Sequence, residues 1–426
     1  MAGISKLSVV YRGWGEDWPL GTLADAGGRV LFEYSPQAIS RGLQFSPLQL
    51  PLPVAGAAPA AYSGPAHFLG LPGFIADSLP DGWGMLLMDR AWRKAGRNPH
   101  GVSVLERLAV VGGSAIGALA FEPAEEIESE RAGIVQIAAL AREVERAVKD
   151  TRERGSAGQL RHLLVLGGSP QGARPKALLR WQRDNGVFSQ EDAGPQAGQP
   201  WLIKFPAQRE HPEVCAIETL YTRLARAGGM DVPESAYFPL GAGHSAFGAL
   251  RFDRVPDHRS ALEFRVPMLS LAALLHADFR LPALDYETVL LATARLTGDY
   301  RETLKAFGRC VFNVLAHNRD DHAKNFAYCM NAQGHWKLSP AFDLTFSLGP
   351  GGQHSTSVAG EGAAPGRANL LQVARRGGVK EKDALACISH WREALQPQPA
   401  LLRDLPVRRA TLQAMRKALE AVWKDV

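Results

Sequence analysis

The 426-residue sequence predicts an α+β fold built from two lobes, and three observations support this prediction. As far as about residue 255, short apolar runs alternate with Gly, Pro and Asp turns, a pattern typical of strands. From residue 268 onward, apolar residues instead recur at the spacing of a helix face. Hydrophobic content of 46% and charged content of 21% are ordinary for a globular protein. We therefore expect a β-rich amino-terminal part followed by a helical carboxy-terminal lobe.

Charge, cysteine content and hydropathy narrow the class of protein. The net charge is +5 and the pI is about 9.0, so an acidic partner such as ATP or nucleic acid is permitted, but no dense Lys/Arg run demands one. The four cysteines show no C-x-x-C spacing, which favours a reduced compartment over a disulfide framework. The sequence has neither a signal-peptide pattern nor an apolar stretch of 18 residues, so we expect a cytoplasmic protein without membrane contact.

Residues 1–125 form the first predicted unit, a small α+β subdomain. Strands are expected at 7–14 and 29–35, where apolar residues run between turn signals. Residues 78–96 begin with a Ser-Leu-Pro-Asp-Gly turn and continue as an apolar helix, because an early Pro and Asp favour a helix start. Residues 102–123 predict a helix, a glycine pair and a further strand.

The second predicted unit, residues 126–255, contains a glycine-rich turn. A helix up to about residue 150 precedes it, and a strand follows it. The turn fails the Walker A test, because Ala and Arg follow Gly172 where Lys and Ser/Thr are required. It better fits a loop whose backbone amides cover phosphates, and a plain flexible hairpin is the alternative. Its candidate phosphate-binding residues are Gly168, Ser169, Gly172 and Lys176.

A lysine and a glutamate follow this loop at a suggestive spacing. Lys204 lies in the short apolar strand 201–206, and Glu218 lies on the helix that comes next. In protein kinases a strand lysine contacts the α- and β-phosphates of ATP, and a helix glutamate holds it in place. Most strand lysines simply reach solvent, which is the alternative for Lys204.

Residues 311–347 contain the candidate catalytic and metal-binding residues. An apolar helix leads into a polar loop at 318–325, a hairpin follows, and Asp343 comes at its end. Asp320 and Asn325 have the D-x-x-x-x-N spacing of a catalytic loop, in which Asp orients the attacking hydroxyl and Asn holds Mg²⁺. Asp343 stands where a second metal ligand is needed. Alone, such residues are often turn residues. Combined in this order with the preceding motifs, they predict a two-lobed protein-kinase-like fold whose carboxy-terminal lobe is 256–426.

With these motifs established, the chain closely resembles the HipA family, the serine/threonine-kinase toxins of bacterial type II toxin–antitoxin systems. The resemblance covers nearly the whole chain and implies an extra amino-terminal subdomain in front of the kinase lobes. Its most specific segments are SLPDGWG (78–84), LAVVGGSAIGALAFEP (108–123), GGSPQGARPKALL (167–179), RFDR (251–254), RDDHAKNFAY (319–328) and LSPAFDLTFS (338–347).

The resemblance implies a role for each matching residue. Asp320 would be the catalytic residue, and Asn325 and Asp343 would bind Mg²⁺. The backbone near Phe252 would meet the adenine of ATP, and Glu218 would support Lys204. The remaining ATP contacts would be made by Gly168, Ser169, Gly172, Lys176, Lys204, His322 and Lys324. Ser169 also falls at the serine that this family autophosphorylates, and a phosphate there would repel the nucleotide phosphates.

The sequence departs from ordinary protein kinases at three points. His322 replaces the Lys usually found two residues after the catalytic Asp, an order similar to lipid kinases and to this family. Asp343-Leu-Thr replaces Asp-Phe-Gly. Asp321 beside Asp320 offers a second carboxylate, although the spacing to Asn325 favours Asp320. Residues 347–368 are rich in Gly and Ser, and we expect them to be flexible.

Three functions follow from different classes. The first is a protein serine/threonine kinase toxin, whose family targets include aminoacyl-tRNA synthetases. The second is a small-molecule or lipid kinase. The third is a degenerate kinase that acts as a DNA-bound co-repressor. If the chain is the kinase toxin or the co-repressor, the implied partner is a HipB-like helix-turn-helix antitoxin, through which the chain would mainly reach DNA.

Overall fold

The computed structural model describes residues 3–54, 60–125, 133–150, 156–167, 170–257, 262–396 and 399–426. The chain divides into two compact units. Unit 1 comprises Met1–Pro212, Phe238–Leu269 and Asn331–Gly334, and unit 2 comprises Glu213–Tyr237, Ser270–Met330 and His335–Val426. The boundaries predicted at residues 125 and 255 stay a prediction. Within the described residues, no helix has the length and apolar character needed to cross a membrane.

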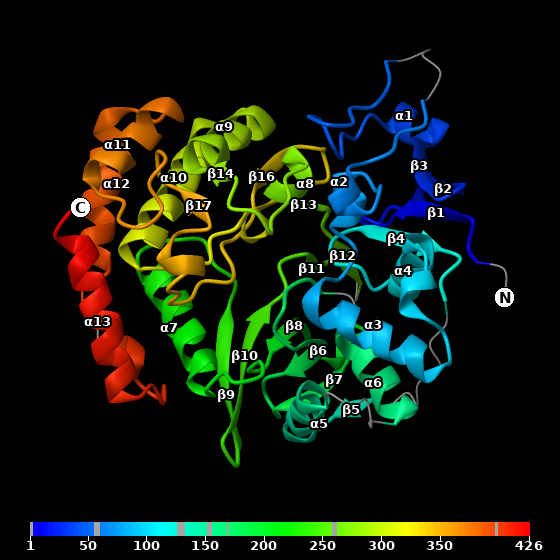
Figure 1. Ribbon diagram of the computed structural model, residues 1–426, viewed down its shortest axis with the longest axis horizontal. Helices are drawn as coiled ribbons and strands as arrows, with labels where there is room; N and C mark the ends of the chain where they lie inside the picture. Colours follow the sequence, from blue (N-terminus) through cyan, green and yellow to red (C-terminus); the bar gives the residue numbers. More distant parts are fainter. Residues whose placement is uncertain are drawn as a thin grey trace. The chain divides into compact units, whose positions relative to one another are not determined.

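Unit 1 begins with a four-stranded sheet in the order β3-β2-β1-β4, and all of its pairings are antiparallel (Figure 1). The predicted first strands and the strand after the glycine pair are confirmed. Alternate residues of β3, Val30, Phe32 and Tyr34, are buried, as expected for a strand with one face on the core. The strands are β1 (Lys6–Tyr11), β2 (Trp18–Ala26), β3 (Arg29–Tyr34) and β4 (Leu119–Glu122).

Helices and 3₁₀ turns connect these strands. The Phe74 ring of α2 packs edge-on against Phe32 of β3, with ring centroids 5.6 Å apart. Ser103 and Glu106 form a capping box that starts α4, which explains why the helix predicted in 102–123 begins there. The elements are α1 (Pro36–Arg41), η1 (Ala66–Phe68), α2 (Gly73–Ala76), α3 (Gly82–Lys94), η2 (Pro99–Gly101) and α4 (Val104–Val111).

A six-stranded sheet in the order β5-β7-β6-β8-β10-β9 forms much of the rest of unit 1, and β11 and β12 form a separate two-stranded sheet (Figure 1). The predicted strands after the glycine-rich turn and around Lys204 are confirmed as β6 and β8. On this sheet, the buried Trp201 and the half-buried Phe238 both contact the half-buried Trp181 ring edge-on. The elements are β5 (Ile134–Val135), α5 (Ile137–Lys149), α6 (Ala157–Gly167), β6 (Lys176–Gln182), β7 (Val187–Gln190), η3 (Glu191–Ala193), η4 (Pro195–Ala197), β8 (Gln199–Lys204), β9 (Ser235–Gly241), β10 (His244–Leu250), β11 (Arg254–Pro256) and β12 (Glu263–Arg265).

Unit 2 is mainly helical, as predicted, and α10 is its central helix. Helices α9, α12 and α13 pack against α10, whose residues from Ala306 to Leu315 are all buried (Figure 1). Asp285 and Asp299 cap the starts of α9 and α10 with their side chains. The helices are α7 (Glu213–Ala227), α8 (Leu271–Leu275), α9 (Tyr286–Thr297), α10 (Tyr300–Leu315), η5 (Ala323–Asn325), η6 (Pro350–Gly352), α11 (Arg367–Arg376), α12 (Glu381–Ala394), η7 (Pro399–Leu402) and α13 (Arg409–Trp423).

Short strands complete unit 2. The predicted hairpin after the polar loop is confirmed, since β15 and β16 pair antiparallel. Strands β14 and β17 pair in parallel and join the start of α9 to the segment after Asp343. The strands are β14 (Leu284–Asp285), β15 (Ala327–Met330), β16 (Trp336–Leu338) and β17 (Thr356–Ser357), and β13 (Met268–Ser270) lies where the two units meet in sequence.

Candidate active site

Two buried lysines lie side by side in the larger sheet of unit 1. Lys176 is the first residue of β6 and Lys204 the last of β8, and they are direct partners in the antiparallel register. Directly opposed residues project from the same face of a sheet, so both lysine side chains leave the same face. They are only 5% and 6% exposed. Like charges in this position repel each other, and a bound polyanion such as a triphosphate would relieve that repulsion.

Each lysine is also held by its surroundings. The Lys204 ammonium lies 5.7 Å from the ring centroid of Phe247, its register partner on β10. The Lys176 ammonium donates to the backbone oxygen of Gln171 in the glycine-rich turn. Lys176 therefore links the strand to the turn that precedes it.

The glycine-rich turn is docked on the SLPDGWG segment of the same unit. The Gln171 side chain donates to the backbone oxygen of Asp77 at 2.7 Å, and the Gly172 N–H donates to the Asp81 carboxylate. The backbone N–H of Trp83 donates to the backbone oxygen of Gly172 at 3.3 Å. Gly172 has φ of 103°, a conformation that favours glycine. Two of the predicted loop residues, Gly168 and Ser169, lie outside the described residues.

In unit 2, the end of α10 delivers the polar loop that contains Asp320. The Asp320 side chain is 53% exposed. The Asn325 Nδ2 donates to the Asp320 backbone oxygen at 2.7 Å, so that its own side-chain oxygen is the atom left to meet a cation. The His322 Nε2 lies 4.0 Å from the Asp320 carboxylate. The loop thus brings together three of the predicted site residues: Asn325 and His322 lie beside the exposed Asp320.

The neighbouring carboxylate, Asp321, has the opposite environment. It is 1% exposed and accepts hydrogen bonds from four protein donors, among them the Tyr286 hydroxyl at 2.7 Å. A carboxylate whose acceptor sites are filled by the protein cannot take a proton from a substrate hydroxyl. This environment favours Asp320 over Asp321 as the residue that meets a substrate.

Asp343 adopts a left-handed backbone conformation, with φ of 58°. Such conformations are uncommon for residues other than glycine, and they concentrate at functional sites. A carboxylate at Asp343 and an amide oxygen at Asn325 are the hard oxygen ligands that Mg²⁺ prefers. The described residues contain no cluster of three or more His, Cys, Asp or Glu side chains able to hold a metal. This donor set fits Mg²⁺ bound together with water and substrate phosphates, because Mg²⁺ rarely uses all-protein cages.

An aromatic residue that the sequence did not single out supports two of the predicted phosphate contacts. The Lys324 ammonium lies 4.1 Å from the ring centroid of Phe279, and the His322 ring centroid lies 5.8 Å from it. Arg280 covers the Phe279 ring at 4.8 Å. A cation over an aromatic face is attracted by the ring quadrupole. Phe279 therefore contacts two residues of the catalytic loop, Lys324 and His322.

The RFDR segment is held by buried charges within unit 1. Arg251 and Arg254 each donate to the Asp253 carboxylate at 2.7 Å, and the Gly117 N–H donates to it at 2.8 Å. Burial alone would raise the pKa of Asp253, but the two guanidinium groups outweigh it and hold that pKa well below its usual range. Phe252, the predicted adenine neighbour, is therefore fixed between two residues of a rigid ionic network.

The predicted ion pair between Lys204 and Glu218 stays a prediction. Lys204 belongs to unit 1, whereas Glu218 belongs to unit 2. Glu218 is 1% exposed on α7, where its backbone oxygen accepts from the Thr222 hydroxyl.

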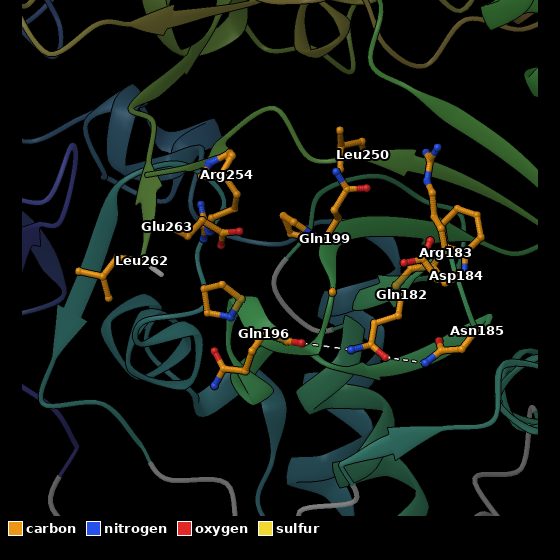
Figure 2. Close-up of a pocket in the computed structure, with 15 residues that line it drawn as sticks. Gln182, Arg183, Asp184, Asn185, Gln196, Gln199, Leu250, Arg254, Leu262 and Glu263 are labelled. Atoms are coloured by element: carbon orange, nitrogen blue, oxygen red, sulfur yellow. Dashed lines mark hydrogen bonds between the residues drawn. The ribbon is translucent and has the colours of Figure 1, made fainter. Parts of the chain in front are cut away.

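A separate hollow of about 610 Å³ lies at the other ends of β6 and β8 (Figure 2). In it, the Gln182 amide donates to the Gln196 backbone oxygen at 3.1 Å and accepts from Asn185 at 2.9 Å. Arg254 and Glu263 line another side of it. None of the predicted site residues lines this hollow, so it is distinct from the lysine pair.

Comparisons with known proteins find matches to both the amino-terminal and the carboxy-terminal parts of the chain. The family described as HipA-like C-terminal domain matches residues 168–398, and the HipA N-terminal domain family matches residues 12–122. The protein named "Putative kinase Y4dM" of Sinorhizobium fredii is 29% identical over 164 residues, which cover 35% of this chain and 38% of that protein. A "Putative kinase" of Haemophilus influenzae is 25% identical over 153 residues, which cover 34% of this chain and 44% of that protein. The matches therefore span less than half the length of either relative.

The same fold occurs in a solved structure. HipA of Shewanella oneidensis MR-1, in a complex with HipB and operator DNA, gives a TM-score of 0.69 at 15% identity, with 98% of this chain and 96% of that chain covered. At this identity the likeness shows the fold alone. It confirms the predicted α+β architecture of the kinase-like type with an amino-terminal β subdomain.

Proposed function

Because the chain belongs to the HipA family, we propose that it is an ATP- and Mg²⁺-dependent serine/threonine protein kinase. The observation that carries the proposal is the contrast between two adjacent acids. Asp320 is exposed and held by Asn325, while Asp321 is buried and saturated by protein donors. This is the arrangement expected of a catalytic loop that presents one carboxylate to an acceptor hydroxyl. The two relatives named as kinases support the same reaction class.

In the proposed reaction, the chain's own residues position charges and one proton. Lys176 and Lys204 hold the phosphates of ATP, and Asp320 orients the acceptor hydroxyl and accepts its proton. The acceptor oxygen forms a bond to the γ-phosphorus as the bond to the β–γ bridging oxygen breaks, and ADP leaves. Asn325 and Asp343 would hold Mg²⁺, which when bound would neutralise charge on the β- and γ-phosphates.

His322 and Lys324 are proposed to contact the transferred phosphoryl group. Both lie in the catalytic loop with Asp320, and both are supported by Phe279. Electrostatic groups aimed at the charge of the transition state contribute most of the catalysis in phosphoryl transfer. In unit 1, the backbone near Phe252 is proposed to meet the adenine.

The biological role is proposed by analogy with the family. We propose that the chain is the cytoplasmic toxin of a HipA/HipB-type system with a helix-turn-helix antitoxin, through which it mainly reaches DNA. A component of translation such as an aminoacyl-tRNA synthetase is the proposed substrate, and Ser169 the proposed autophosphorylation site. The crystallised complex of the Shewanella protein with HipB and operator DNA supports this assignment.

The test is transfer of label from γ-labelled Mg²⁺·ATP into a bacterial protein extract, with Asp320→Ala as the control. A labelled protein band that requires Asp320 supports the protein kinase. Label that enters only the small-molecule fraction favours a metabolite or lipid kinase, the second candidate suggested by His322. A DNA mobility shift that requires this chain but no ATP, without any label transfer, would favour the non-catalytic co-repressor.

A further inference from the structure

We infer that Asp321 is the positioning residue of the catalytic loop and that it anchors residues 349–363 as a preformed platform beside Asp320. The inference rests on the proposed kinase function for its catalytic part. The anchoring itself follows from contacts inside unit 2 alone. The sequence offered Asp321 as an alternative catalytic carboxylate to Asp320. The geometry instead indicates that Asp321 positions the loop.

The Asp321 carboxylate is a hub with four hydrogen-bond donors. One oxygen accepts from the Tyr286 hydroxyl at 2.7 Å and from the His354 Nδ1 at 2.8 Å. The other accepts from the backbone N–H groups of Ser355 and Thr356, at 2.8 and 3.2 Å. The Asp321 side chain is 0% exposed and that of His354 is 2% exposed. A buried carboxylate that lost these donors would leave several polar groups unsatisfied, so this hub strongly favours one arrangement.

Helices α9 and α10 make the hub rigid. Tyr286 is the first residue of α9 and is fully buried, and its hydroxyl accepts from the Asn313 Nδ2 at 2.8 Å. The Asn318 Nδ2 donates to the Asn313 side-chain oxygen at 2.9 Å. Burial first, and the Asp321 carboxylate second, raise the pKa of Tyr286 well above its usual value, so the hydroxyl remains a donor. The start of the catalytic loop is thereby tied to two helices.

The same hub holds the segment after Asp343, which the sequence predicted to be flexible. That prediction is wrong for the part of the segment tied to the catalytic loop. The Thr356 hydroxyl donates to the Asp321 backbone oxygen at 2.6 Å, and the Ser355 hydroxyl donates to the Arg319 backbone oxygen at 3.1 Å. The Arg319 guanidinium in turn donates to the backbone oxygens of Gly352 and Ala363, the latter at 2.7 Å. Five residues of the segment are therefore bonded to Arg319 or Asp321, which makes the segment an extension of the catalytic loop: Gly352, His354, Ser355, Thr356 and Ala363.

A second carboxylate fixes the far side of the segment without touching the catalytic loop. Asp285 accepts from the Ser357 hydroxyl at 2.6 Å and from the Gly360 N–H at 2.8 Å. Strand β17 pairs with β14 at this point. The segment is therefore held by both Asp321 and Asp285 in the chain as it stands, with no added phosphate. In a kinase, the segment after the second metal ligand is where the acceptor binds and where activation usually acts. Here the fold itself supplies the ordering.

The experiment compares the whole chain with Asp321→Ala, Asp321→Asn and a matched control, Glu213→Gln. Glu213 is also a buried carboxylate of unit 2, but it binds Arg408 and Thr411 at the carboxy-terminal helix. Asn at position 321 can still accept from the two backbone N–H groups, so its effect should be the smaller. Two quantities are measured: hydrogen exchange at residues 352–358, and ADP release from Mg²⁺·ATP together with the affinity for a fluorescent ATP analogue.

We expect the Thr356 amide of Asp321→Ala to exchange about tenfold faster, since it loses a charged hydrogen-bond acceptor. The Ser355 amide should accelerate less, because it also donates to the Arg319 backbone oxygen at 3.2 Å. We expect kcat to fall about a hundredfold because the catalytic Asp320 carboxylate is misplaced. Nucleotide affinity should change less than about twofold, because the lysine pair is untouched. Glu213→Gln should change neither exchange at the segment nor kcat.

Unchanged exchange in Asp321→Ala would overturn the anchoring role. Faster exchange with an unchanged kcat would overturn the positioning role. If the wild-type chain neither binds the analogue nor releases ADP, the proposed kinase function is wrong, and the exchange measurement alone then supports or overturns the anchor.

Discussion

Lys176 and Lys204 lie directly opposite each other on neighbouring antiparallel strands, and both side chains are buried. Burying two charged side chains has a desolvation cost. It also creates a local positive potential of the kind that binds phosphates. Stability and ligand binding should therefore respond in opposite directions when one of the two charges is removed.

The variant Lys204→Met tests this relationship. Without ATP, its Tm should equal or exceed that of the wild type, because an apolar side chain of similar volume removes the desolvation cost of a buried charge. Its affinity for Mg²⁺·ATP should fall at least about tenfold, since a charge-assisted contact is lost. Thermal unfolding with and without Mg²⁺·ATP measures both effects. Lys149→Met, at a side chain that is 68% exposed, is the control. An unchanged ATP-induced rise in Tm for Lys204→Met would contradict the assignment.

Asp343→Asn should weaken Mg²⁺ binding without destabilising the fold. Asn tolerates the left-handed backbone that Asp343 adopts, so the free energy of unfolding should change little. The Mg²⁺ concentration that gives half-maximal phosphotransfer should rise at least about tenfold, because a carboxylate ligand becomes neutral. Titration of activity with Mg²⁺ measures this, with the exposed Asp425→Asn as the control. An unshifted Mg²⁺ titration would rule Asp343 out as a ligand.

Phe279→Leu should remove the ring contacts to Lys324 and His322 while keeping an apolar side chain at this position. Loss of a cation–π contact of about 1 kcal/mol predicts a roughly fivefold lower kcat/KM for ATP. Phe279→Tyr keeps the aromatic face and should retain most of the activity. Steady-state kinetics of both variants decide the point. Equal activity of the Leu and Tyr variants would show that the ring acts only as an apolar surface.

The lowered pKa of Glu213 predicts how the free energy of unfolding depends on pH. Burial alone would raise its pKa, but hydrogen bonds from Arg408 and Thr411 lower it from its usual 4.5 to about 2. A depressed pKa contributes stability that is present above pH 4.5 and is lost as the pH falls towards 2. Glu213→Gln should therefore be less stable by about 2 kcal/mol at pH 7, with the difference shrinking in acid. Urea unfolding of both chains at pH 7 and at low pH measures it. A difference that does not vary with pH would contradict this account.

Much of the fold was predictable because local patterns carried it. Alternation in β3 and helical spacing in α10 are visible in the sequence, and the structure bears them out. The spacing of Asp320 and Asn325 is also local, and the structure brings them together through the Asn325 amide. These features depend on neighbours within a few residues.

What the sequence could not provide were partners distant along the chain. Nothing near Asp321 indicates that Tyr286 and His354, more than thirty residues away on either side, donate to its carboxylate. Composition suggested a flexible segment there, since Gly and Ser are abundant, but hydrogen bonds to a buried carboxylate outweigh composition. Phe279 likewise gave no signal, because a lone aromatic residue in a loop has many possible roles. Only the tertiary arrangement distinguishes them.

The central claim is that this chain transfers a phosphoryl group through Asp320. Intact-protein mass spectrometry after incubation with Mg²⁺·ATP tests it most directly, with wild type and Asp320→Ala treated alike. The account predicts one added phosphate on the wild-type chain, mapped to Ser169, and none on the variant. Equal phosphate on both chains would contradict the role of Asp320, and no phosphate on either, together with no ATP binding, would contradict the kinase itself.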